Sequence, residues 1–188
     1  MKPILFNEEE TRFDTYGMGE IDVLDIQIER IRNGNYTIYF EYPANGPLAS
    51  VLKNGMQIKA DAGTRTKNQT FDITRVVKNS GKTIKVYGHH IKHRLEKIVF
   101  RNGQAFGGSA STALATLKNI IVGDNNWDVA SDITTTGKGV FDISKMGSVH
   151  SALGGVEGSI LDIYVSNKGC NISPFLNSTF APNVFALS

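Results

Sequence analysis

The first ninety residues alternate apolar and polar side chains with the period of two that a half-buried β-strand requires. Segments 26–30 and 36–42 both follow this alternation, and Asn33-Gly34 lies between them. Asn-Gly is the strongest short-range signal for a β-hairpin, because both residues tolerate the positive φ angles of a type I′ turn. We therefore predict an antiparallel hairpin with its turn at Asn33-Gly34.

More segments of the same kind follow, each bounded by turn residues. Segment 56–60 comes directly after Asn54-Gly55, and segments 71–77 and 82–87 are separated by Asn79-Ser80-Gly81. The last two segments are expected to pair with each other across that turn. Several short strands at this spacing predict a small β-barrel or sandwich.

The periodicity becomes helical after about residue 91. Ser109 or Ser111 can cap a helix, and Gly123 can end it. The apolar residues Leu114, Leu117 and Ile121 fall on one face of this helix. A second domain is therefore expected to begin near Leu95.

Weaker signals follow this helix. They are a strand near 127–129, a turn at 136–139 and a short helix at 148–153. The chain is thus divided into a β-barrel domain over 1–93, an α+β domain over 94–164 and an irregular segment over 165–188. The predicted fold class is α+β with a predominance of β-structure.

Composition narrows the function classes. The 188 residues carry a net charge of only +2, with acidic and basic residues mixed along the chain, so the sequence lacks the basic footprint of a protein that binds nucleic acid or anionic membranes. No apolar run approaches the eighteen residues of a membrane span, and the start is too weakly apolar for a secretory signal. We expect the chain to be made in a cytoplasm. The single cysteine, Cys170, excludes an intramolecular disulfide.

One cluster, His89, His90 and His93, can carry chemistry. Imidazoles are common zinc ligands, and His89 and His93 would share a face if this stretch were helical. The glutamate that serves as general base in helical zinc peptidases is missing, because Ile91 and Lys92 stand between them. We favour a structural interpretation, in which these histidines lie at a strand-to-helix transition, over a metal site.

Two kinds of residue, a pair of serines and a cysteine, are candidate nucleophiles near His150 or in combination with it. Ser148 and Ser151 flank His150, but helix capping explains both serines without a strained elbow that would expose a catalytic serine. Cys170 and His150 could form a catalytic thiol-imidazole pair, but no feature of the sequence fixes their geometry.

The remaining candidates concern binding. The acidic run 8–10 is expected to be an exposed loop rather than a cation site, and the glycines at 17–19 and 103–108 lack phosphate-loop or dinucleotide spacing. Alternating aromatic residues usually divide between the core and cross-strand contacts, although a carbohydrate platform is the alternative for Tyr36, Tyr39, Phe40 and Tyr42. We assign no catalytic, cofactor-binding or metal-binding residue.

A series of segments, taken together, resembles one family. They are Pro3-Ile4-Leu5-Phe6, 13–21, 29–36, Phe40-Glu41-Tyr42-Pro43, 69–73, Tyr87-Gly88-His89-His90, 147–153 and 158–162. In this order they resemble the N-terminal region of the siphophage and prophage tail-tip protein family, also called tail-associated lysin or prophage endopeptidase tail. The likeness stops after about Ile163.

The resemblance implies a tail-tube-like β-barrel that carries an inserted α+β domain, as in the central hub protein of contractile-tail baseplates. It implies a structural role in the virion: a homotrimer at the tail tip that closes the distal end of the tube. The distal tail protein would be its partner, with the tape-measure protein as a further one, after assembly in the host cytoplasm. We do not assign the endopeptidase activity in the family's name to this chain, so we expect the chain to have no enzymatic activity and no cofactor. The alternatives are a metal-dependent peptidoglycan hydrolase and a carbohydrate-binding β protein.

Replacing Gly34 by Val tests the predicted turn. A β-branched residue is strained at positive φ, so the free energy of unfolding should fall by about 1 to 2 kcal/mol. Urea denaturation measures it, and Gly34→Asn, which tolerates the same backbone, is the control. Equal stability of the two variants would contradict a type I′ turn.

Overall fold

The computed structural model describes most of the N-terminal half of the chain and shorter stretches of the rest. The described residues are 2–31, 35–64, 66–78, 81–101, 105–106, 108–123, 128–131, 141–142, 146–153, 159–160, 172–174 and 184–187. Two compact units divide the chain between Ile91 and Lys92. Each unit is described by itself.

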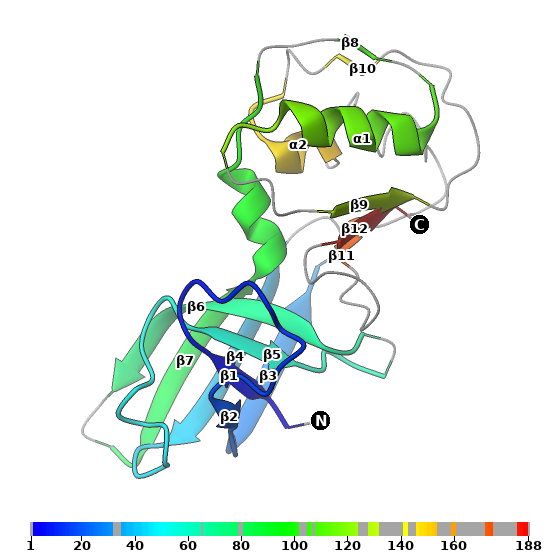
Figure 1. The fold of residues 1–188 in the computed structure, drawn as a ribbon. Helices are drawn as coiled ribbons and strands as arrows, with labels where there is room; N and C mark the ends of the chain where they lie inside the picture. The colour runs from blue at the N-terminus through cyan, green and yellow to red at the C-terminus, as the bar shows by residue number, and fades with distance from the viewer. Residues whose placement is uncertain are drawn as a thin grey trace. The chain divides into compact units, whose positions relative to one another are not determined.

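The first unit is built on one antiparallel sheet of seven strands. The strands are β1 (Ile4–Phe6), β2 (Gly19–Glu20), β3 (Asp25–Arg30), β4 (Tyr36–Pro43), β5 (Gln57–Ala60), β6 (Gln69–Lys78) and β7 (Thr83–His90). Their order in the sheet is β2-β1-β5-β6-β7-β4-β3, and the sheet curls into a half-barrel with β2 and β3 at its edges (Figure 1). The prediction of a mostly β fold is confirmed, with a half-barrel where we expected a small barrel.

Both predicted hairpins form. Strands β3 and β4 pair antiparallel with Ile28 opposite Ile38, and the N–H of Ile31 donates to the carbonyl of Asn35 at 2.8 Å. Three residues, 32–34, therefore connect the paired ends, where the predicted type I′ turn would have two. The turn residues Asn33 and Gly34 lie outside the described part of the chain. Strands β6 and β7 pair in the same way, although Asn79 and Ser80 of their turn also lie outside it.

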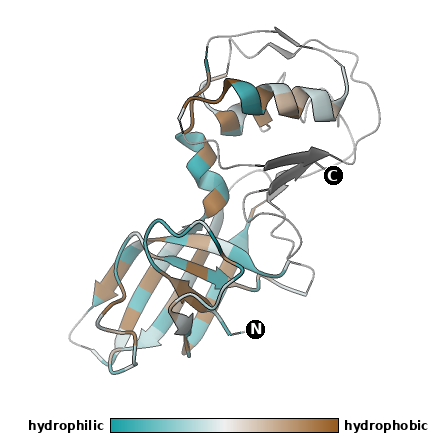
Figure 2. Ribbon diagram, in the orientation of Figure 1, coloured by the Kyte–Doolittle hydropathy of each residue, from teal (hydrophilic) through white to brown (hydrophobic). Residues whose placement is uncertain are grey.

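The core lies on the concave face of this sheet. Along β4, buried residues alternate with half-buried ones, and the brown and teal positions of the neighbouring strands alternate likewise (Figure 2). The largest fully buried side chains of this core are Leu5, Ile21, Ile38, Phe40, Leu52, Met56, Ile58, Phe71 and Ile73. Each contributes about 1.5 to 3 kcal/mol relative to an exposed position, so the period-two pattern supplies the main driving force for this unit.

A smaller cluster covers the opposite face of β1. Phe13, from the segment between β1 and β2, packs edge-on against Phe6 with ring centroids 5.2 Å apart. The ammonium group of Lys59 donates to the carbonyl of Phe13 and lies 5.4 Å from the centre of the Phe6 ring, and burial lowers the pKa of Lys59. Gly17 has φ +49°, and a Cβ there would lie 2.4 Å from the carbonyl oxygen of Leu5, so only glycine lets this segment approach β1 so closely.

The second unit combines helices with short strands. Its elements are η1 (Ile91–Glu96, whose first residue belongs to the first unit), β8 (Ala105–Phe106), α1 (Ala110–Ile120), β9 (Asp128–Ser131), β10 (Phe141–Asp142), α2 (Val149–Leu153), β11 (Ile172–Pro174) and β12 (Val184–Leu187). Ser109 is the N-cap of α1, since its Oγ accepts a hydrogen bond from the Thr112 N–H at 3.2 Å. Both predicted helices therefore form.

The strands of this unit pair over long distances in sequence. Strand β12 pairs antiparallel with β11 and parallel with β9, and β8 pairs antiparallel with β10. Strands β11 and β12 both lie in segment 165–188, for which the sequence pattern predicted no regular element. A proline in β11 and the brevity of both strands hide them from a search for local alternation, because their pairing partners are distant.

The helices of this unit bury their apolar faces in a core of their own. It contains Leu95, Ala110, Ala113, Leu114, Leu117, Val149, Ala152, Leu153 and Ile160. Among the described residues, no helix is both long enough and apolar enough to cross a bilayer.

Replacing Gly88 by Ala tests the close approach of β6 and β7. A Cβ at this buried position would lie 2.7 Å from the carbonyl oxygen of Asp72 and 2.9 Å from Cγ2 of Ile38. We expect the free energy of unfolding to fall by about 1 to 3 kcal/mol, because the sheet backbone itself would have to move. Chemical denaturation measures the loss.

Gly81→Ala is the matched control in the same hairpin, because a Cβ there meets nothing within 4 Å. Its stability should stay within about 0.5 kcal/mol of the parent. Equal losses in the two variants would show that the Gly88 contact is not limiting.

Candidate functional site

The histidine run lies at the predicted strand-to-helix transition. Strand β7 ends at His90, and η1 begins at Ile91. Consecutive strand residues point to opposite faces, so His89 is exposed on the convex face while His90 is fully buried on the concave face. These two imidazoles do not share a ligand position. Within the described ranges, no group of three or more His, Cys, Asp or Glu side chains is placed to hold a metal ion.

His90 packs between aromatic rings. Its ring stacks on Tyr36 with centroids 4.4 Å apart and 7° between the planes, and it meets Phe71 edge-on at 5.2 Å. Burial raises the pKa of Tyr36 to about 12, so the phenol stays neutral at physiological pH. The His90 imidazole thus forms part of the core where β4 begins and β7 ends.

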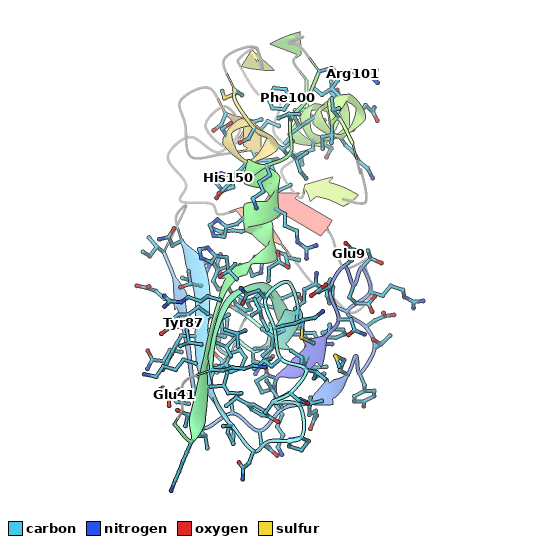
Figure 3. All side chains as sticks on the ribbon, turned by 90° about the vertical axis from the view of Figure 1, so that its left-hand side faces the viewer. Glu9, Glu41, Tyr87, Phe100, Arg101 and His150 are labelled. Carbon is cyan, nitrogen blue, oxygen red and sulfur yellow. The ribbon has the colours of Figure 1, made fainter. Side chains whose placement is uncertain are left out.

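His93 lies within reach of a carboxylate and a second imidazole. Its Nδ1 is 2.6 Å from Oε1 of Glu96, and its ring lies nearly parallel to that of His150 with centroids 6.5 Å apart. His150, labelled in Figure 3, has its pKa lowered chiefly by burial. A carboxylate that orients an imidazole is one part of a general-base arrangement, but a nucleophile within hydrogen-bond distance is also required.

The nearby serines satisfy each other instead. The N–H of Ser148 donates to Oγ of Ser151 at 3.0 Å, and the N–H of Ser151 donates to Oγ of Ser148 at 3.2 Å. This reciprocal arrangement caps the first turn of α2, as the sequence interpretation predicts. Cys170, the other candidate nucleophile, lies outside the described residues.

The acidic run near the N-terminus is engaged locally. Glu8 forms a 2.8 Å ion pair with Lys53, and Oε1 of Glu10 accepts hydrogen bonds from the N–H groups of Thr11 and Arg12 at 3.0 Å. These contacts fit an exposed loop that is held by Glu10 within the loop and by Lys53 from a distant segment.

The convex face of the sheet carries a cluster that sequence reasoning missed. The rings of Tyr39 and Tyr87 lie 5.1 Å apart, and the Arg75 guanidinium lies 5.6 Å from the centre of the Tyr87 ring. The Tyr39 hydroxyl donates to Oε1 of Glu41 at 2.5 Å, and Nζ of Lys85 lies 3.7 Å from the same oxygen. Glu41 and Tyr87 lie on one side of the sheet (Figure 3). We name these five residues the outer-face cluster.

The register in which neighbouring strands pair brings the residues of the outer-face cluster together. Tyr39 stands opposite Tyr87 and Glu41 opposite Lys85, so these two pairs join β4 to β7, while Arg75 stands opposite Tyr87 and joins β6 to β7. The hydrogen bond to Glu41, with burial, raises the pKa of Tyr39 to about 12. Cross-strand pairs of this kind stabilise the sheet.

The four-residue aromatic platform considered from the sequence does not form. Tyr36, Phe40 and Tyr42 are buried on the concave face, and Tyr39 alone of the four faces outward. The alternative interpretation, in which the aromatic residues divide between core and cross-strand contacts, is the one the structure shows.

Strand β3 is another exposed feature of this unit. Ile26 is 36% exposed, and Leu24 and Ile31, at the two ends of the strand, are 61% and 50% exposed. Apolar side chains thus collect at an open sheet edge.

Comparison with known proteins finds a similar structure but no matching family model or curated sequence. No protein-family model matches the sequence, and no curated protein matches it. The structure is similar to the crystal structure of prophage tail protein gp18 from Listeria monocytogenes EGD-e, with a TM-score of 0.61 and 12% sequence identity. The match covers 100% of this chain and 50% of that protein. The chain therefore shares its fold with a prophage tail protein and spans half of that protein's length.

Proposed function

We propose that this chain is a structural component of the tail tip of a long-tailed phage or prophage. The observation that carries the proposal is the similarity of fold to prophage tail protein gp18 over the whole chain. The ordered series of segments that resembles the tail-tip family also supports it, because that likeness rests on the sequence and not on the fold. The finer proposal is a baseplate hub that closes the distal end of the tail tube and contacts the distal tail protein.

The sheet has the physical properties that such a role requires. A half-barrel presents one buried face and one convex face, and the convex face carries the exposed outer-face cluster. Its edge strand β3 leaves backbone groups available for a neighbour. Several copies of such a unit can be arranged around an axis without closing each sheet on itself.

The proposal assigns no catalytic activity to this chain. It is supported by what the described candidate side chains do: His90 packs in the core, and Ser148 and Ser151 cap α2. We therefore propose that the chain acts by assembly, in the virion, after synthesis in the host cytoplasm.

Assembly is the first test. Because the chain spans half the length of gp18, we expect the isolated polypeptide to be a monomer or a weak trimer, and a version extended through any downstream reading frame to form a trimer. Light scattering on each form, alone and mixed with the distal tail protein of the same phage, measures both steps. A stable dimer without affinity for the distal tail protein would contradict the hub proposal.

Cell-wall hydrolysis is the second test. Purified protein incubated with sacculi should cause no loss of turbidity and no release of amines beyond a buffer control. His93→Ala is the informative variant, because His93 is the imidazole that a carboxylate orients. Release by the parent that disappears in His93→Ala would replace the structural proposal with a hydrolase.

A further inference from the structure

Strand β3 is a long open edge. Its six residues pair with β4 in unbroken register, from Asp25 opposite Glu41 to Arg30 opposite Tyr36, and among the described strands it pairs with no other. The opposite edge of the sheet, β2, has only two residues. Natural sheets usually protect an exposed edge with charged side chains, proline, a bulge or a short strand, and within β3 only the first of these is present, as Asp25, Glu29 and Arg30.

Two hydrogen bonds identify the backbone groups that face away from the sheet. The Ala44 N–H donates to the Lys82 carbonyl at 2.8 Å, in line with the β4–β7 register, so even-numbered residues of β4 bond toward β7. The Ile31 N–H donates to the Asn35 carbonyl at 2.8 Å, so odd-numbered residues of β3 bond toward β4. Bonding alternates along an antiparallel strand, and the N–H and C=O groups of Ile26, Ile28 and Arg30 therefore point to the open edge.

The side chains of β3 differ between its two faces. Ile28 packs partly against the concave core, while Ile26 next to it is 36% exposed, so the core ends at this strand. A further strand at the edge would continue that core and cover Ile26. Its residues on the concave face should therefore be apolar.

The convex face of β3 is acidic. Asp25, Gln27 and Glu29 are all exposed there, and Nε2 of Gln27 donates to Oδ2 of Asp25 at 3.1 Å. In the described part of the chain, no Lys or Arg side chain forms an ion pair with Asp25 or Glu29. An added strand would place its own side chains directly opposite these two carboxylates.

We propose that β3 is a strand-addition site for an extended segment of another protein in which apolar residues alternate with lysine or arginine. The backbone of the segment binds the outward N–H and C=O groups of Ile26 and Ile28, and its basic residues lie opposite Asp25 and Glu29. A second copy of β3 fits less well, because it would bring a second Asp25 and Glu29 to the same face. The inference uses only the edge and its charges, so it does not depend on the tail-tip role.

Two matched peptides test the proposal on the full chain. The first is an acetylated, amidated peptide of sequence VKVTVKV, whose two lysines are four residues apart, as Asp25 and Glu29 are, and the second replaces both lysines with glutamate. We expect the lysine peptide to bind about tenfold more tightly, since two cross-strand pairs change from repulsive to attractive. Hydrogen exchange at the amides of Ile26 and Ile28 should slow on binding. Equal binding of the two peptides, or no binding of the lysine peptide at millimolar concentration, would overturn the proposal.

Variants of β3 test separately the two interactions that the proposal requires, the backbone hydrogen bonds at the open edge and the pairs of opposite charge. Ile26→Pro removes an outward N–H without breaking the ladder to β4 and should abolish binding, whereas Ile26→Val, which keeps the N–H, should retain it. The double change Asp25→Lys and Glu29→Lys should reverse the preference toward the glutamate peptide. An unchanged preference in the double variant would overturn the assignment of a basic partner. A homodimer that Ile26→Pro dissociates would instead identify a second copy as the occupant.

Discussion

The curl of the seven-stranded sheet depends on the close approach of β6 and β7 at Gly88. The register of this pair shifts between Ile73 and Arg75, so β6 contains an extra residue at this point. Such a bulge bends its strand and increases the local twist. Gly88 lies opposite Ile73, with space for no side chain between the Asp72 carbonyl and Ile38. The half-barrel and its concave core follow from this bend.

The curl gives the two faces of the sheet different roles. The concave face buries an aliphatic and aromatic core that includes the stacked pair Tyr36 and His90. The convex face displays polar and aromatic side chains, and Tyr39 and Tyr87 meet there across β4 and β7. An open half-barrel also keeps two edges, one of which is the six-residue strand β3. We propose that the convex face and this edge are the parts of the unit that bind other proteins.

The residues that resemble catalytic groups in the sequence have structural surroundings in the fold. His89 and His90 are neighbours in sequence, but the pleat of β7 directs them to opposite faces. Ser148 and Ser151 are three residues apart, and that spacing lets each bind the backbone N–H of the other. These outcomes follow from local geometry, which is why the sequence interpretation preferred them. The outer-face cluster depends instead on the pairing of Tyr39 with Tyr87, which no local pattern reveals.

Local features were determined by the sequence alone. The period-two alternation specified β4 and β7, and Ser109 specified the start of α1, because each depends on residues only a few positions apart. The order of segments also resembles the tail-tip protein family, and the fold is similar to that of a prophage tail protein. Tertiary structure decided the strand order, the bulge opposite Gly88, the pairing of β12 with β9 and the open edge at β3. Each of these features depends on contacts between segments that are distant in the sequence. The packing of the whole sheet sets the free energy of such contacts, and they produce no periodic pattern in the sequence.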